Sequence, residues 1–376
     1  MTGPLQGIKV IEIGQALAGP LAGAILADMG ADVIKIEKPD GGDDARLWGP
    51  PFVNGDSVMF HATNRNKRSV VLDLKTADDI AKLERLTAGA DILIQNLRPG
   101  IVDDIGIGPE AMLARHPGLI YCSIWAFGYQ GPLRLAPGFD PLLQAYGGMM
   151  MVTGRERDPP TFAGAAINDK TTGMWCVIGA LAGLQQRNRT GRGCLVDTSL
   201  FESAVALVEG QLNSYRVTGK TSPRHGTGSN LLVPYQTFET ADRPICIAAG
   251  NDRLFVKCAQ ALGHPEWARD PRFEDGRKRA VNKDALIALL EPALRGKTRA
   301  HWMAALEAAG VPCSPVNDIA ELAQTEQLQA MDMLRDLPGT DLKVIGLPIS
   351  FDRQRPHPHT DSPRLGEHTA ALLGSG

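Results

Sequence analysis

The N-terminal segment of the chain alternates between short β-branched runs and an alanine-rich helical pattern. Residues 8–14 (IKVIEIG) and 31–39 (ADVIKIEKP) have the composition of buried strands, and residues 18–30 (AGPLAGAILADMG) have helical spacing. This order of strand, helix and strand predicts a right-handed βαβ unit in a parallel sheet. No other feature constrains the fold as strongly, because parallel strands need crossover helices between them.

The same alternation continues along the chain. It predicts strands at residues 68–75, 91–96 and 119–128, with a helix at 76–90. These elements indicate a doubly wound α/β half. An apolar helix follows from about Gly173 to Gln186, then a strand and a helix at 193–215. Residues 218–229 are rich in Gly, Ser and Thr, which predicts a linker before a smaller α+β region.

Composition excludes several classes of protein. A chain of 376 residues suggests two domains or one domain with an insertion, and a net charge of −3 does not favour nucleic acid or a membrane as partner. The six cysteines are scattered without a CxxC pair, so we expect no zinc site and no disulfide framework. We see neither a signal peptide nor an apolar run of about 20 residues, and therefore expect a cytoplasmic enzyme without a bound metal.

The first turn of the βαβ unit resembles a dinucleotide site only loosely. In that interpretation Glu37, at the end of the second strand, would hold a ribose. The turn is Gly14-Gln-Ala-Leu-Ala-Gly19, which is not GxGxxG, so Cβ atoms would keep the backbone away from a pyrophosphate. We favour glycines at 19 and 23 that allow close helix packing, with an NAD-linked oxidoreductase as an alternative.

An aspartate stands at the start of the apolar helix, in INDKTTG (167–173). Asp169 can be a helix N-cap that contributes about 1 kcal/mol, and spacing alone favours this role. It can also be a nucleophile, because the N–H groups and partial positive charge of a helix N-terminus hold a carboxylate in its anionic form. The two roles are compatible.

The order of the motifs resembles that of the family III CoA-transferases, the group of formyl-CoA:oxalate and carnitine CoA-transferases. The resemblance extends over nearly the whole chain. It rests on residues 7–46, NRNKRSVVLDLK (64–75), NLRPG (96–100), LIYCSIWAFGYQGP (119–132), GFDPLLQAYGGMM (138–150), GNDRLF (250–255) and LGEHT (365–369).

This resemblance implies an enzyme that moves CoA from an acyl-CoA to a small carboxylic acid, with CoA as substrate and without a permanent cofactor. It places the nucleophile at Asp169, which precedes Thr-Thr-Gly and the apolar helix. The implied relay passes through a mixed anhydride and an aspartyl-CoA thioester.

CoA-binding residues are also implied by the resemblance. They are Gln15, Ala16, Lys38, Leu72, Lys75, Asn96, Leu97 and Arg98. Solvated strand-end lysines and a plain turn at 96–100 explain the same residues without a ligand. The basic cluster Arg65–Arg68 is a further candidate for phosphate, or a solvated charge run.

In architecture the resemblance implies a large Rossmann-like domain (1–218 and 331–376), a linker (219–225) and an inserted α+β domain (226–330). It also implies an interlocked homodimer. Three positions depart from the formyl-CoA transferase pattern: Asp104 and Pro137 replace basic residues, and Phe139 replaces a tyrosine. Residues 248–253 (AAGNDR) replace a glycine-rich loop, which puts formyl-CoA and oxalate in doubt but not the reaction type.

Two other functions remain open. An α-methylacyl-CoA racemase shares the implied fold, but needs a histidine before GFDPLLQ, and Cys122–Asp140 contains none. A catalytically silent acyl-CoA-binding protein is the second alternative.

Overall fold

The computed structural model describes residues 3–229 and 231–374 and divides into two compact units. The first unit runs up to Met149 and also contains Phe162–Leu212 and the chain from Glu326 onward. The second consists of Met150–Thr161 and Asn213–Thr325. Within the described residues, no helix is both long enough and apolar enough to cross a bilayer.

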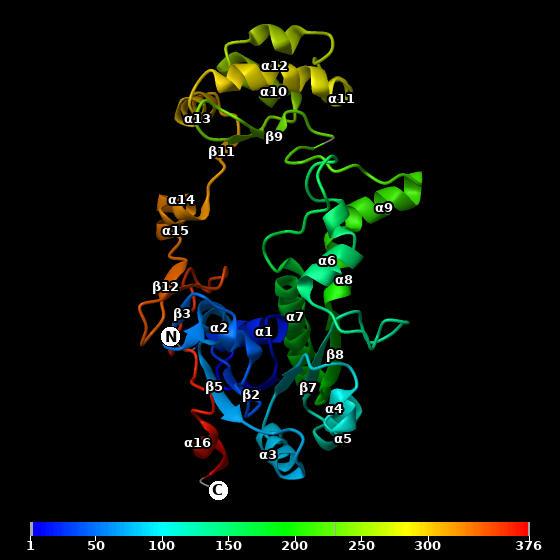
Figure 1. Cartoon of the computed structure of the whole chain (residues 1–376), viewed down its shortest axis with the longest axis vertical. Helices are drawn as coiled ribbons and strands as arrows, with labels where there is room; N and C mark the ends of the chain where they lie inside the picture. Colours follow the sequence, from blue (N-terminus) through cyan, green and yellow to red (C-terminus); the bar gives the residue numbers. More distant parts are fainter. Residues whose placement is uncertain (1–2, 230, 375–376) are drawn as a thin grey trace. The chain divides into compact units, whose positions relative to one another are not determined.

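The first unit is built around a six-stranded sheet in which all strands run parallel (Figure 1). Counted in chain order within this sheet, the strands lie in the order 3-2-1-4-5-6, as in the Rossmann fold. The predicted α/β fold with a parallel sheet is therefore confirmed. From one edge to the other, the strands are β5 (Lys67–Val71), β2 (Asp32–Glu37), β1 (Lys9–Ile13), β6 (Ile92–Gln95), β7 (Ile120–Trp125) and β8 (Cys194–Ser199).

Helices cover both faces of this sheet, which lets strands with buried residues on both sides avoid water. One face belongs to a core cluster that includes Val10, Ile94 and Cys122, and the other to a cluster that includes Ile11 and Tyr121. The first cluster takes in α1 (Ala18–Asp28) and α7 (Ile167–Thr190), and the second takes in α3 (Ala77–Thr87), α4 (Ile101–Asp104), α5 (Pro109–Arg115) and α16 (Thr369–Leu373).

Helix α7 begins at Ile167, so the predicted start near Gly173 is wrong. Gly173 is a packing position within the helix and does not end it. A Cβ atom there would lie 2.8 Å from the carbonyl oxygen of Ala18, the first residue of α1. The glycine therefore allows α7 to approach α1 closely, and tertiary packing outweighs its low helix propensity.

Shorter elements complete the first unit. Those of the N-terminal half are η1 (Asp44–Leu47), β3 (Phe52–Val53), β4 (Asp56–Ser57) and α2 (Val58–Asn64). The others are α6 (Asp140–Tyr146), α8 (Leu200–Leu207), α15 (Glu326–Ala330), β12 (Leu334–Asp336) and β13 (Lys343–Ile345). At the units' limits lie η2 (Met149–Met151) and α9 (Glu209–Thr218).

The second unit has a three-stranded antiparallel sheet in the order β11–β10–β9. Its helices pack on this sheet around a core of its own, in which Phe255, Phe273 and Leu290 are almost completely buried. The elements are β9 (Tyr235–Phe238), β10 (Ile245–Ala248), α10 (Asp252–Ala261), η3 (Pro265–Arg269), α11 (Gly276–Val281), α12 (Lys283–Arg295), α13 (Arg299–Ala308), β11 (Cys313–Pro315) and α14 (Ile319–Ala323).

Candidate active site

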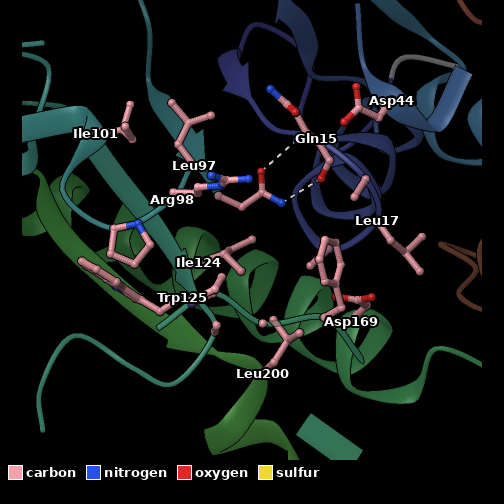
Figure 2. Close-up of a pocket in the computed structure, with 18 of the residues that line it drawn as sticks. Gln15, Leu17, Asp44, Leu97, Arg98, Ile101, Ile124, Trp125, Asp169 and Leu200 are labelled. Atoms are coloured by element: carbon pink, nitrogen blue, oxygen red, sulfur yellow. Dashed lines mark hydrogen bonds between the residues drawn. The ribbon is translucent and has the colours of Figure 1, made fainter. Parts of the chain in front are cut away.

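A pocket of about 650 Å³ opens at the carboxyl ends of three neighbouring strands of the first unit, β1, β6 and β7 (Figure 2). The strand order reverses between β1 and β6, and open α/β sheets bind ligands at such a point. The lining residues are Gln15, Ala16, Leu17, Ala18, Asp44, Trp48, Asn96, Leu97, Arg98, Pro99, Ile101, Ile124, Trp125, Ala126, Pro137, Gly138, Phe139, Asp169 and Leu200.

The turn after β1 is held on both sides of Gln15 by one side chain. Asn96 Oδ1 accepts a hydrogen bond from the Gln15 N–H at 2.8 Å, and Asn96 Nδ2 donates to the Gln15 carbonyl oxygen at 2.8 Å (Figure 2). The next residue, Ala16, has a left-handed backbone (φ 66°), which is unfavourable for a residue with a Cβ atom. The main chain at this edge of the pocket is therefore fixed, while the Gln15 amide has no hydrogen-bond partner among the described residues.

Asp169 lies in the first turn of α7 and borders the pocket. It is not the N-cap: that position is Ala166, whose side chain caps nothing. A carboxylate from another helix takes the capping role. Asp140 Oδ1 accepts hydrogen bonds from the backbone N–H groups of Asn168, at 2.7 Å, and Asp169, at 3.3 Å. The N-cap interpretation of Asp169 is therefore wrong, and its side chain is not committed to the helix end.

The electrostatic environment of Asp169 differs from the expectation. Burial, together with the nearby charge of Asp140, raises the pKa of the Asp169 carboxyl to about 7. The expected stabilisation of its anion by the helix N-terminus does not prevail, because Asp140 already accepts from the first N–H groups. Among the described residues, no group donates a hydrogen bond to the Asp169 carboxylate. Near neutral pH the Asp169 carboxyl is therefore close to its pKa, and the anion that forms at the edge of the cavity is poorly stabilised.

Asp140 also organises the segment that leads into α7. Its Oδ2 atom accepts from Gln144 Nε2 at 2.6 Å, and Gln144 Oε1 accepts from the Ala163 N–H at 2.8 Å. Asp140 and Gln144 are both buried. Gln144, one helical turn after Asp140 in α6, therefore fixes the backbone at Ala163, shortly before α7 and Asp169.

The predicted CoA-contact residues fall into two groups. Five of them line the pocket with Asp169: Gln15, Ala16, Asn96, Leu97 and Arg98. Lys38, Leu72 and Lys75 are not among its lining residues. Lys38 pairs with Asp44 at 2.6 Å, Leu72 is buried in the core, and Lys75 is exposed after β5. Among the described lining residues, Arg98 alone carries a positive charge.

The basic residues of the cluster 65–68 form ion pairs within the first unit. Arg65 binds Asp28, Arg68 binds Asp32, and Lys67 Nζ lies 2.7 Å from Glu12 Oε2. Its interpretation as a phosphate site or solvated run is therefore wrong for Arg65 and Lys67, which are buried and paired.

Glu37 is likewise unavailable to a ribose. It accepts from Arg46 Nε at 2.9 Å and Nη2 at 2.7 Å, and from Ser69 Oγ at 2.6 Å. Ion pairing with Arg46 and Lys35 outweighs the effect of burial and lowers the pKa of Glu37. The decision against a dinucleotide site at this strand end agrees with this geometry.

Sequence reasoning missed several lining residues. Ile124 and Trp125 lie within the strand predicted at 119–128 and end the observed β7, and the rule that ligands bind at carboxyl ends of parallel strands could have found them. The same rule applies to Leu200, which directly follows β8, whereas Trp48 carries no such signal and is brought to the pocket by tertiary packing.

Comparison with known proteins identifies the family. The sequence matches CoA-transferase family III over residues 5–369. The chain belongs to this family. Transferases of the family use CoA thioesters as substrates, and this chain is accordingly an acyl-CoA:carboxylate CoA-transferase.

Named relatives of this family III chain are similar over most of their length. The acetyl-CoA:oxalate CoA-transferase of Acetobacter aceti is 39% identical, over 98% of this chain and 95% of its own. The succinyl-CoA:glutarate CoA-transferase of Mus musculus is 33% identical, over 98% and 86%. A solved CAIB/BAIF family protein from Brucella suis is 39% identical, with a TM-score of 0.90 and 99% of both chains covered. The two curated relatives are named as transferases, which favours transfer over the racemase and silent-binder alternatives.

Proposed function

We propose that Asp169 is the acyl acceptor of a two-stage relay. A carboxylate oxygen of Asp169 attacks the thioester carbonyl carbon, the C–S bond breaks, and CoA thiolate leaves a mixed anhydride. The thiolate then attacks the aspartyl carbonyl carbon, which releases the donor acid and forms an aspartyl-CoA thioester. An acceptor carboxylate attacks this thioester and releases thiolate again. The thiolate finally attacks the acceptor's acyl carbon, yielding new acyl-CoA and free Asp169.

The observation that supports this role most strongly is the uncommitted Asp169 carboxyl at the pocket. A nucleophilic carboxylate has to shed water and hydrogen bonds before it attacks. Burial and Asp140 raise its pKa to about 7, so the anion that forms is less stabilised, and hence more basic, than an exposed aspartate. A helix cap or a structural ion pair would give the carboxylate a hydrogen-bond donor or a positively charged partner, and the Asp169 carboxylate has neither among the described residues.

Gln15 is the best candidate for binding the acyl oxygen. The backbone N–H groups of Gln15 and Ala16 already donate to Asn96 and Asp43. Neither can serve a developing oxyanion. Gln15 borders the same pocket as Asp169, and its side-chain amide has free donors among the described residues, which suits it to stabilise the tetrahedral intermediate.

We assign Ala16, Asn96, Leu97 and Arg98 to the bound CoA, because they share this pocket and Arg98 supplies the positive charge that phosphates require. Lys38 and Lys75 are proposed to contact the nucleotide end of CoA beyond the lining residues, whereas Leu72 is buried in the core and is not available to it.

As substrates we propose small dicarboxylic acids and their CoA thioesters. The support is sequence similarity to relatives that are named as oxalate and glutarate CoA-transferases. Phe139 and Pro137, which line the pocket, are where the chain departs from the formyl-CoA transferase pattern, so the acid itself is a matter for assay.

We further propose an interlocked homodimer with a large Rossmann-like domain (1–218 and 331–376) and an inserted small domain (226–330) joined by residues 219–225. The outer side of α7 supports a subunit contact, since Met174, Trp175 and Ile178 are 46%, 48% and 54% exposed. Exposed apolar side chains that gather on one helix are typical of protein interfaces. The observed second unit differs from the proposed small domain: it runs from Asn213 to Thr325, and it also contains Met150–Thr161, which the proposal assigns to the large domain.

Trapping of the acyl-enzyme tests the relay. The protein is incubated with acetyl-CoA or succinyl-CoA, treated with hydroxylamine, and digested for peptide mass spectrometry. We expect a hydroxamate on Asp169, none with free CoA alone, and none in Asp169→Asn. The Asp28→Asn variant, which changes a buried carboxylate bound by Arg65, is the matched control and should still be labelled. Unmodified Asp169 in active protein would refute the assignment.

A further inference from the structure

A chain of four buried charges runs beneath helix α1. Lys67 Nζ lies 2.7 Å from Glu12 Oε2, Glu12 Oε1 lies 3.0 Å from Lys35 Nζ, and Lys35 Nζ lies 2.9 Å from Asp43 Oδ2. All four side chains are fully buried. Glu12 and Lys35 are direct neighbours across strands β1 and β2, so the sheet itself sets their register. The charges balance, two negative and two positive.

The fit of this chain beneath α1 depends on a glycine. A Cβ atom at Gly23 would lie 1.8 Å from Glu12 Oε2. The close packing expected at Gly23 is thus confirmed, and what it makes room for is the Glu12 carboxylate.

The last residue of this chain of charges, Asp43, contacts the backbone of Ala16, which lines the pocket. Asp43 Oδ1 accepts hydrogen bonds at 3.0 Å from the N–H groups of both Ala16 and Ala45. Ala16 is the residue with the left-handed backbone, a conformation that costs about 1–2 kcal/mol for a residue with a Cβ atom. On its other side, Asn96 fixes Gln15. Asp43 therefore holds the one strained peptide of the turn.

Lys35 keeps the Asp43 carboxylate ionised, so that it can accept hydrogen bonds. Burial by itself would raise the pKa of Asp43, but Lys35 and the two backbone N–H groups outweigh burial and lower it. Burial would likewise lower the pKa of Lys35, whereas Glu12 and Asp43 raise it above the usual range. Lys35 also donates to the Gly14 carbonyl oxygen at 2.7 Å, so it contacts the turn directly.

We propose that Asp43 is a positioning residue that holds Ala16 in its left-handed conformation, and so aims Gln15 into the pocket, with Lys35, Glu12 and Lys67 anchoring it to the sheet. This inference rests on the proposed function of the pocket. Buried ion pairs are often replaceable by apolar residues without loss of stability, so stability alone does not account for four charges here. A constraint on the turn does.

The test compares Asp43→Ala with Asp28→Ala. Asp28 is an equally buried carboxylate of the same unit, paired with Arg65 at the opposite end of α1 from the pocket. Loss of the Asp43 hydrogen bond and of the left-handed conformation predicts a fall in kcat/KM for acyl-CoA that is roughly tenfold larger than in the control. If the alanine variants do not fold, Asp43→Leu and Asp28→Leu serve, because leucine also removes the acceptor but fills the space.

Two readouts separate positioning from mere stability. The first is amide hydrogen exchange of Ala16 in ligand-free protein, which should accelerate in Asp43→Ala but not in the control. The second is Asp43→Ala in an Ala16→Gly background, where glycine adopts the left-handed conformation without strain. The loss caused by Asp43→Ala should there shrink several-fold.

Equal Ala16 exchange in the two variants, or an unchanged loss in the Ala16→Gly background, would overturn the inference. The exchange readout requires no substrate. If wild-type protein forms no adduct on Asp169, the proposed function is refuted. Amide exchange of Ala16 would still test the positioning role of Asp43.

Discussion

The carboxylate of Asp140 caps the helix that carries Asp169. Its Oδ1 atom lies 2.7 Å from the backbone nitrogen of Asn168 and 3.3 Å from that of Asp169 itself. One aspartate thus satisfies the helix N-terminus and leaves the other free. The same proximity places two negative charges together, which adds to the effect of burial in raising the pKa of Asp169 to about 7.

Asp169→Asn is expected to abolish transfer and, at pH 8, to stabilise the fold. The folded-state pKa of about 7 lies above the unfolded value of 3.8, so the folded protein binds the extra proton between them. Stability contributed by this group is therefore full below about pH 4 and is lost as the pH rises toward 7. The variant should gain roughly 2–4 kcal/mol in urea unfolding at pH 8 and little at pH 4. Equal gains at both pH values would contradict the raised pKa.

The pH dependence of acylation should follow the same group. Because the attacking species is the carboxylate, kcat/KM for acyl-CoA should rise with pH and level off above about 7. Asp140→Asn keeps an oxygen acceptor for the helix end but removes the charge. It should move the inflection to lower pH, whereas Asp28→Asn should leave it in place. If the inflection stays at the same pH in Asp140→Asn, burial alone raises the pKa of Asp169.

Asn96→Ala should impair the turn after β1 with little effect on the global fold. It removes two hydrogen bonds to Gln15, each worth about 1 kcal/mol. We expect kcat/KM for acyl-CoA to fall by on the order of tenfold, with a loss of at most about 2 kcal/mol in unfolding free energy. Steady-state kinetics and urea titration measure both. A large loss of stability without a kinetic effect would make Asn96 a purely structural residue.

Gly23→Ala should destabilise the first unit by several kcal/mol, because the new methyl group would meet Glu12 Oε2 at 1.8 Å. The matched control is Gly210→Ala in α9, where a Cβ atom meets nothing within 4 Å. There the change should be neutral or stabilising by about 0.5–1 kcal/mol. Denaturant unfolding of the two variants gives the comparison, and a tolerated Gly23→Ala would mean that the buried charges have room to move.

The local pattern of the chain was sufficient to predict the parallel sheet. Strands 8–14, 31–39 and 91–96 are β-branched runs between helical segments, and such runs become parallel strands wherever helices connect them. The motif order was likewise sufficient to identify the family, and placed Gln15, Asn96 and Arg98, which the structure brings to one pocket with Asp169.

Contacts between distant segments lay beyond such reasoning. The sequence around Asp169 suggested a cap that stabilises its anion, but the cap comes from Asp140, 29 residues earlier, and has the opposite effect on its pKa. Lys67 was interpreted as part of a phosphate-binding cluster or a solvated basic run, yet β5 places it beside the buried Glu12 of β1. In both cases the amino-acid sequence determined which charges exist and in which elements they lie. Tertiary packing determined which charges meet away from water, and in a buried site that proximity decides both ionisation and strength of interaction.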